Sequence, residues 1–265
     1  MYMHQKHHYL LRLQFLGFRF SGWQRQPGEK TVEGMLLKTL SFVLPGRKSK
    51  VLGAGRTDAR VSALDFALQL WITGPPLSSQ EVFLQEMNQN LPQDLRLLSV
   101  HKVPLDFNVI RDCTGKRYRY YFTFGDKPHP FCAPLLGYFP GYLNIESMKK
   151  GAALFVGDHN FRAFTGSPGE DTRTKRNVTK CHLEHNSDLT ASFFPAQSFC
   201  LTVAGRGFGR YQVRRMMAAL VALGRGTLTE ADLAASLKTG DPIDLKDIAP
   251  ASGLQLMEVE FSLDA

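Results

Sequence analysis

Hydrophobic and polar residues alternate along several short stretches of the chain, and a period of two residues is typical of half-buried strands. In the first stretch, Leu11, Leu13 and Phe15 alternate with Arg12 and Gln14. The sequence favours further strands at residues 66–72, 95–103, 118–124 and 254–261.

Apolar residues at helical spacing predict five helices. Four of them begin at a suitable N-cap residue, and these residues are Thr31, Ser78, Asn144 and Thr229. At Ser78 and Thr229, an acidic residue three positions later completes the pattern of a capping box. The fifth helix is predicted where apolar residues recur from Val213 to Gly224.

Strands and helices mix along the chain without regular β-α-β crossovers, and the order of strand and helix recurs in the second half. This arrangement favours the α+β class, with two similar lobes that share an antiparallel sheet. The best boundary between the lobes lies near Pro104, which predicts domains at residues 1–104 and 105–265.

Nothing in the sequence points to a membrane. No run of about 18 apolar residues could span a bilayer. The first eight residues are polar and rich in histidine, and Arg12 and Gln14 interrupt the apolar stretch that begins at Tyr9. A signal-peptide core is therefore not expected, and we predict a cytoplasmic protein.

The formal net charge of +8 favours an anionic partner, because clustered Lys and Arg residues neutralise phosphates and release their counterions. The four cysteines form no C-x-x-C pair, and the histidines lack the spacing of zinc ligands. We therefore predict no metal site. Isolated buried or half-buried thiols are expected at Cys113, Cys132, Cys181 and Cys200.

The segment from Gly53 to Asp58 reads Gly-Ala-Gly-Arg-Thr-Asp and lies in a polar loop between two apolar stretches. A dinucleotide site is disfavoured, because the third glycine and the acidic ribose ligand are missing. The chain also has no G-x-x-x-x-G-K-[ST] motif, so no nucleotide cofactor is expected. Locally, Arg56-x-Asp58 fits either an ion-paired turn or a catalytic carboxylate in a loop.

Two further segments combine basic and aromatic residues. Between Lys116 and Tyr120, alternation places Tyr118 and Tyr120 on one face of a strand, which suits either a core strand or a base-stacking surface. Residues 206–215 open a helix, and Arg210 and Arg214 are predicted to share its face at i, i+4 spacing. Either a solvated surface or an anion between the two like charges fits this pair.

At these segments the chain resembles the TruA-like tRNA pseudouridine synthases along nearly its whole length. Gly55-Arg56-Thr57-Asp58-Ala59 matches the family's G-R-T-D motif, whose aspartate is the catalytic residue. Shorter matches follow in the family's order at residues 20–24, 31–34, 90–92, 107, 111, 118–120, 157–161, 208, 213–214, 249–250 and 253–254.

The resemblance implies two RRM-like (ferredoxin-like) lobes that form one central antiparallel sheet, with helices packed on one side and an active cleft between the lobes. It implies a homodimer that binds tRNA. The activity it implies is an isomerase that converts uridine to pseudouridine in the anticodon arm, typically at positions 38 to 40. No cofactor is expected for this isomerisation.

The resemblance also gives each matching residue a role. Asp58 is expected to attack C1′ or C6 of the nucleotide or to remove its 2′ hydrogen, and these routes stay open. Arg214 would pair with Asp58, Tyr118 would stack on the extruded uracil, and Arg56 would hold a phosphate or fill the space of the flipped nucleotide. Candidates for contacts to the RNA backbone are Arg173, Lys175, Arg176, Arg206 and Arg210.

The chain departs from the family pattern at four positions. Arg60 and Ser62 replace the glycine and histidine of G-R-T-D-A-G-V-H. Because arginine avoids positive φ, the loop beyond Asp58 is expected to have a different shape. Asn160 replaces the aspartate of H-D-F, and Arg215 replaces the asparagine that follows V-R. These departures leave the target uridine and the range of substrates open.

A function of a different class is a divergent or catalytically silent RNA-binding paralogue. Asp58 favours the enzyme, because an RNA-binding protein needs the arginines and the tyrosine but no buried acid. An enzyme acting on a small phosphate compound is disfavoured, because basic residues are spread over both predicted lobes.

Overall fold

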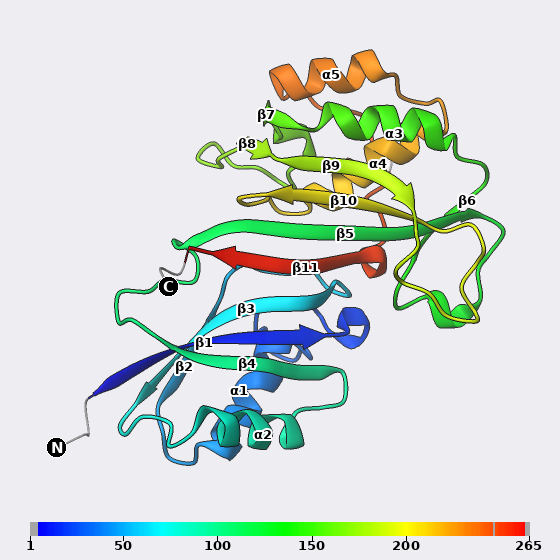
Figure 1. The fold of residues 1–265 in the computed structure, drawn as a ribbon. Coiled ribbons are helices and arrows are strands. Elements are labelled where there is room, and N and C mark those ends of the chain that lie inside the picture. The colour runs from blue at the N-terminus through cyan, green and yellow to red at the C-terminus, as the bar shows by residue number, and fades with distance from the viewer. Residues whose placement is uncertain (1–4, 246, 263–265) are drawn as a thin grey trace. The chain divides into compact units, whose positions relative to one another are not determined.

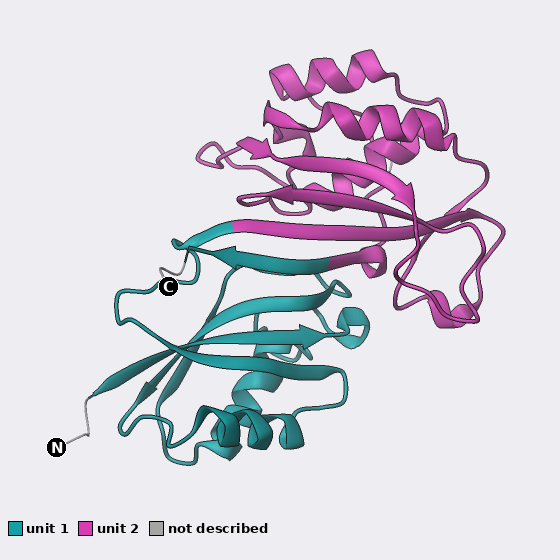
Figure 2. Cartoon of the chain, in the orientation of Figure 1, with its two compact units in different colours: residues 1–114, 256–265 teal, residues 115–255 magenta. Residues whose placement is uncertain are grey.

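The computed structural model describes residues 5–245 and 247–262, which form two compact units (Figures 1 and 2). Unit 1 contains the chain up to residue 114 and the stretch from residue 256 onward, and unit 2 contains residues 115–255. The predicted α+β class is confirmed, since the described residues contain mostly antiparallel strands together with five α-helices. The domain boundary near Pro104 stays a prediction.

Unit 1 is built around the strands next to β1 (Lys6–Phe15). Its other elements are η1 (Gly17–Arg19), α1 (Val32–Val43), β2 (Ser49–Gly53), β3 (Ser62–Thr73), α2 (Gln80–Asn90), β4 (Leu95–Val103) and most of β11 (Leu254–Phe261). β1 lies between β4 and β3 and is antiparallel to both, while β2 also pairs with β3. Leu11 and Leu13 of β1 are fully buried opposite Leu68 and Phe66 of β3, as the alternating pattern predicted.

Unit 2 repeats the mixture of strands and helices. It contains β5 (Cys113–Gly125) from its third residue, η2 (Pro130–Cys132), β6 (Gly137–Pro140), α3 (Ile145–Leu154), β7 (Gly157–Asn160), η3 (Arg162–Phe164), β8 (Lys175–Val178), β9 (Lys180–His185), β10 (Phe199–Gly205), α4 (Gln212–Gly224), α5 (Glu230–Thr239) and η4 (Ala251–Gly253). β10 pairs antiparallel with β5 and β9, β6 runs parallel to β5, and β7 pairs with β8. Helices α3 and α4 meet so closely that a Cβ on Gly151 would lie 2.2 Å from Leu223.

Side-chain caps explain where four of the five described α-helices begin, at Thr31, Ser79, Asn144 and Thr229. Thr229 and Asp232 form the predicted capping box of α5. The predicted box at Ser78 is wrong, because Ser79 is the N-cap of α2 and its hydroxyl accepts the N–H of Val82 at 3.2 Å. Among the described residues, no helix is long and apolar enough to cross a membrane.

Candidate active site

Asp58 lies in the loop of residues 54–61 that joins β2 to β3 in unit 1. The N–H of Trp23 donates a hydrogen bond to the carbonyl oxygen of Thr57 at 3.1 Å. Next to this bond, Gly22 has a φ of 93°, and a Cβ at this position would lie 2.6 Å from the same carbonyl oxygen. The loop therefore meets the turn before α1 backbone to backbone, with no room for a side chain.

The turn that supports the loop is fixed in its own right by the first residues of α1. The N–H groups of Val32 and Glu33 donate to the carbonyl oxygens of Gly22 and Trp23 at 3.1 and 3.0 Å. These donors have no partner within the helix, so the turn satisfies them. The half-buried Asp58 is thus held in place through the N-terminus of a helix.

The residues after Asp58 form a tight turn in which the N–H of Val61 donates to the Asp58 carbonyl oxygen at 3.2 Å. The expectation that Arg60 avoids positive φ is wrong, because its φ is 67°. The N–H of Arg60 donates to the carbonyl oxygen of Phe20 at 3.0 Å, and its guanidinium lies 5.8 Å from the Phe18 ring. These contacts hold an arginine where the family has glycine.

Aromatic packing lies close to the start of the loop. The rings of Trp23 and Phe66 stack with their centroids 4.2 Å apart. A Cβ on Gly53 would lie 2.8 Å from both rings, so the end of β2 passes directly against them. Arg56, in contrast, is exposed. Its side chain is accessible to a partner, as a phosphate-binding role requires.

In unit 2, the predicted alternation of β5 is confirmed. Tyr118 lies opposite Val203 and Tyr120 opposite Leu201, which places both tyrosines on one face of the strand. Tyr118 is half-buried, and its ring meets Phe208 edge to face at a centroid distance of 5.2 Å. The structure therefore brings together Tyr118 and Phe208, which lie in two separate segments that match the family.

Residues 206–215 lead into α4, as predicted, but Arg210 and Arg214 do not share a helix face. Arg210 precedes the helix, and the N-cap Tyr211 has a φ of 61°, which turns the chain before the helix begins. Both guanidinium groups instead lie against the Tyr211 ring, at 4.7 Å for Arg210 and 5.4 Å for Arg214. The ring thus provides an attractive contact for each cation.

Arg214 also contacts the segment before η4. Its Nε donates to the carbonyl oxygen of Ala249 at 2.8 Å, and the Tyr120 hydroxyl donates to the carbonyl oxygen of Pro250 at 2.8 Å. Burial raises the pKa of Tyr120, and the positive charge of Arg214 opposes this rise. Arg214 and Tyr120 lie in two segments that match the family, and both are therefore hydrogen-bonded to the main chain of a third such segment, residues 249–250.

Four of the five candidates for RNA-backbone contacts lie on β8 or in segments next to it, whereas Arg210 lies against the Tyr211 ring. Arg173 is exposed in the preceding loop, and Lys175 and Arg176 are on the strand. Burial, and secondarily the charge of Arg173, lower the pKa of Arg176. A Cβ on Gly207 would lie 3.8 Å from Nη1 of Arg176, which places this guanidinium beside the segment that begins at the exposed Arg206.

Three departures from the family pattern have local explanations. The Asn160 side-chain amide donates to the carbonyl oxygen of Thr239 at 3.0 Å, a bond that an aspartate could not make when ionised. Nε of Arg215 donates to the carbonyl oxygen of Ala163 at 3.1 Å. The buried hydroxyl of Ser62 accepts a backbone N–H at 2.9 Å. These side chains help to hold the structure together.

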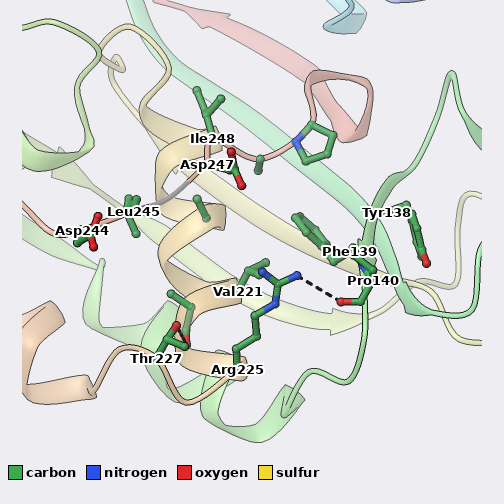
Figure 3. Close-up of a pocket in the computed structure, with 14 residues that line it drawn as sticks. Tyr138, Phe139, Pro140, Val221, Arg225, Thr227, Asp244, Leu245, Asp247 and Ile248 are labelled. Atoms are coloured by element: carbon green, nitrogen blue, oxygen red, sulfur yellow. Dashed lines mark hydrogen bonds between the residues drawn. The ribbon is translucent and has the colours of Figure 1, made fainter.

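A cavity of about 690 Å³ lies within unit 2 between α4, β6 and residues 244–245 and 247–250 (Figure 3). Arg225 crosses one side of it and donates to the carbonyl oxygen of Pro140 at 3.3 Å. The predicted site residues do not line this cavity. Its wall does include Ala249, whose carbonyl oxygen binds Arg214.

The prediction of isolated thiols is confirmed for all four cysteines, which are free and buried. Burial raises the pKa of Cys200 to about 11, so its thiol is protonated at neutral pH. Within residues 5–245 and 247–262, no group of three His, Cys, Asp or Glu side chains is placed to hold a metal ion.

Sequence reasoning missed two residues that shape the site. Gly22 lies inside the match at residues 20–24, and a glycine in a turn-rich stretch is a usable signal for close backbone approach. Tyr211 gave no such signal, because a tyrosine with positive φ is uncommon.

Comparison with known proteins agrees with the motifs. A sequence model of the tRNA pseudouridine synthase family matches residues 152–262. The tRNA pseudouridine synthase A of Limosilactobacillus fermentum is 32% identical, with 98% of each chain covered. The proteins of the same name from Oenococcus oeni and Geotalea daltonii are also 32% identical, over 96% and 95% of this chain and 97% and 98% of theirs.

The matches extend over nearly the whole chain and include both compact units. The chain therefore belongs to the tRNA pseudouridine synthase A family, a family of isomerases that act on tRNA. This confirms the resemblance that the G-R-T-D motif and its companion segments indicated.

Proposed function

We propose that the protein converts uridine to pseudouridine in the anticodon arm of tRNA, typically at positions 38 to 40, with Asp58 as the catalytic carboxylate. The observation that carries this proposal is the fixed loop around Asp58. Hydrogen bonds at Thr57 and Arg60, on either side of the aspartate, tie the loop to the turn before α1. A catalytic group needs this kind of preorganised support.

The reaction explains why a carboxylate is needed. The C1′–N1 bond of uridine breaks, the base turns, and C1′ joins C5, while C5 loses a proton and N1 gains one. Asp58 takes part either by attacking C1′ or C6 or by removing the 2′ hydrogen. Each route requires an ionised carboxylate in a fixed position. The isomerisation leaves the oxidation state unchanged, so no redox cofactor is required.

Three further residues complete the proposed site. Tyr118 stacks on the uracil after the nucleotide has left the base stack, and its half-buried ring beside Phe208 is suited to this. Arg214 keeps Asp58 ionised by pairing with it. Arg56 holds a neighbouring phosphate or fills the space of the flipped nucleotide, and its exposure supports either role.

The RNA backbone is bound by the basic residues of unit 2. Arg176 supports this assignment, because burial and the charge of Arg173 both disfavour its charged form and a phosphate would relieve this. The proposed contacts are made by Arg173, Lys175, Arg176, Arg206 and Arg210. A homodimer and a cytoplasmic location stay predictions of the sequence.

Mass-spectrometric mapping of pseudouridine in unmodified tRNA, incubated with the pure protein, tests the proposal. We expect new pseudouridine in the anticodon arm, and we expect it also when a chelator is present. tRNA binding without any product would instead support the silent RNA-binding paralogue. Product outside the anticodon arm would contradict the proposed target while leaving the activity established.

A further inference from the structure

The side chain of Arg214 is held at two points along its length. Its Nε donates to the carbonyl oxygen of Ala249 at 2.8 Å, and the N–H of Ala249 donates back to the Arg214 carbonyl oxygen at 3.4 Å. Further out, the guanidinium carbon lies 5.4 Å from the centre of the Tyr211 ring. The ring therefore limits where the charged end of the arginine can point.

Tyr211 occupies this position in an unfavourable backbone conformation. Its φ of 61° lies in the left-handed region, where a side chain with a Cβ is strained. Hydrogen bonds hold the chain on both sides, since the N–H of Gly166 donates to the Arg210 carbonyl oxygen at 2.8 Å and the N–H of Arg215 donates to the Tyr211 carbonyl oxygen at 2.9 Å.

The ring itself lies against bare backbone. A Cβ on Gly166 would be 2.4 Å from the Cδ2 atom of Tyr211, so only glycine leaves space for the ring. On the ring, the Arg210 guanidinium carbon is 4.7 Å from the centroid, and its Nη2 donates to the Tyr211 hydroxyl at 3.0 Å. One aromatic ring therefore contacts two cations that would otherwise repel each other.

We propose that Tyr211 is a positioning residue. Its ring holds the Arg214 guanidinium in the orientation that the arginine needs for its role in the tRNA modification reaction. The inference rests on the proposed function, in which Arg214 belongs to the reaction site. Backbone strain that persists in a folded protein must be outweighed by its surroundings, and such strain clusters at functional sites. Here the strained backbone places an aromatic ring beside the arginine of the proposed site.

Variants of Tyr211 separate the ring from the strain. Tyr211→Asn and Tyr211→Gly remove the ring and tolerate the left-handed backbone, so the fold is expected to persist. Tyr211→Phe keeps the aromatic face and loses only the hydroxyl. We expect the single-turnover rate to fall about tenfold in the first two variants and to be largely rescued in the third. tRNA affinity should stay within about threefold throughout.

Two readouts distinguish positioning from a general structural effect. The acid limb of the pH–rate profile should move upward in Tyr211→Asn, as we also expect for Arg214→Ala, because a carboxylate without a well-placed cation ionises less readily. The ¹H–¹⁵N resonance of Arg214 Nε–H, assigned by its loss in Arg214→Lys, should change its shift and exchange faster in Tyr211→Asn but not in Tyr211→Phe. Tyr142→Asn is the matched control, because Tyr142 is 77% exposed and lies outside the proposed site.

The outcomes are separable. If Tyr211→Asn and Tyr211→Gly keep the wild-type rate, the pH profile and the Arg214 resonance, the positioning role is wrong although the synthase activity stands. A lower rate with an unmoved profile and resonance also overturns it. If the wild type forms no pseudouridine, the proposed function fails, and the resonance alone decides whether Tyr211 places Arg214.

Discussion

The loop around Asp58 in unit 1 and the start of α4 in unit 2 hold side chains of the proposed site in different ways. The loop is fixed through its main chain, by hydrogen bonds at Thr57 and Arg60. At the start of α4, side-chain contacts act on Arg214 far from its own backbone, at the Tyr211 ring and at the Ala249 carbonyl oxygen.

The difference follows from the length of the side chains. An aspartate has only two side-chain torsions, so a fixed main chain leaves its carboxylate few positions. An arginine has many rotamers, and ordering it costs far more conformational entropy unless contacts guide it along its length. Both regions contain a non-glycine residue with positive φ, Arg60 in the loop and Tyr211 at the helix. Backbone strain is thus common to both solutions.

The largest expected effect comes from removing the carboxylate that the loop presents. Asp58→Asn should lower product formation at least roughly a thousandfold, because the proposed catalytic group is lost. tRNA affinity should stay within about tenfold, since binding is spread over many phosphates. Single-turnover assays and filter binding measure the two quantities. Substantial turnover by this variant would remove Asp58 from its role.

Main-chain support of the loop is tested at Gly22. Gly22→Ala should destabilise the protein by about 3 kcal/mol and lower activity, because the new Cβ would lie 2.6 Å from the Thr57 carbonyl oxygen at a φ of 93°. Gly28→Ala is the matched control, since Gly28 also has positive φ but has no atom within 4 Å of such a Cβ. Its cost should be about 1 kcal/mol in denaturant unfolding. Equal costs would show that the close approach at Gly22 is unimportant.

Side-chain guidance is tested at Arg214. Arg214→Ala should lower the rate roughly a hundredfold. The acid limb of the pH–rate profile should move upward, because a carboxylate without its cation ionises less readily. Arg214→Lys should restore only part of the rate, since lysine lacks the planar fork. If Arg214 were only a surface cation, the acid limb would stay in place and the salt dependence of tRNA binding would fall by about one phosphate contact.

Tyr118 tests whether the aromatic face of β5 serves the substrate. Tyr118→Ala should cost about 2 kcal/mol, or roughly thirtyfold in rate, if the ring stacks on uracil. Tyr118→Phe should lose much less, because it keeps the ring that meets Phe208 edge to face. Equal and mild losses in the two variants, measured with saturating tRNA, would mean that Tyr118 serves packing alone.

The smallest effect is expected at Arg60, where backbone strain can be relieved. Arg60→Gly should stabilise the protein by up to about 1 kcal/mol, because glycine adopts a φ of 67° freely. Ala59→Gly should destabilise the protein. Ala59 has no positive φ, so glycine there only raises the conformational entropy of the unfolded chain. Thermal unfolding of both variants measures the signs. Destabilisation by Arg60→Gly would show that the contact with Phe18 outweighs the strain.

Much of the fold could be predicted from local patterns, because burial on one face leaves a period in the sequence. The strand at Leu95–Val103 and the strand at Leu254–Phe261 were predicted with the bounds they have. β9 was missed although Cys181 and Leu183 alternate with polar residues there. Its neighbour β10 is buried almost throughout and therefore has no clear period.

The site was predictable to the extent that short motifs contain it. G-R-T-D located Asp58, but the shape of its loop depends on a turn more than thirty residues earlier, which no local pattern reveals. The same limit applies to Tyr211. Its ring position depends on Gly166 and on the chain that precedes α4, so only the three-dimensional structure shows it.

The stacked pair of Trp23 and Phe66 has a spectroscopic consequence. The chain has two tryptophans, Trp23 and Trp71, and both belong to unit 1, whereas unit 2 contains none. Indole emission therefore reports on the unit that carries Asp58 and not on the unit that carries Arg214. Because Trp23 also donates its backbone N–H to Thr57, its fluorescence offers a label-free signal for motions of the aspartate loop.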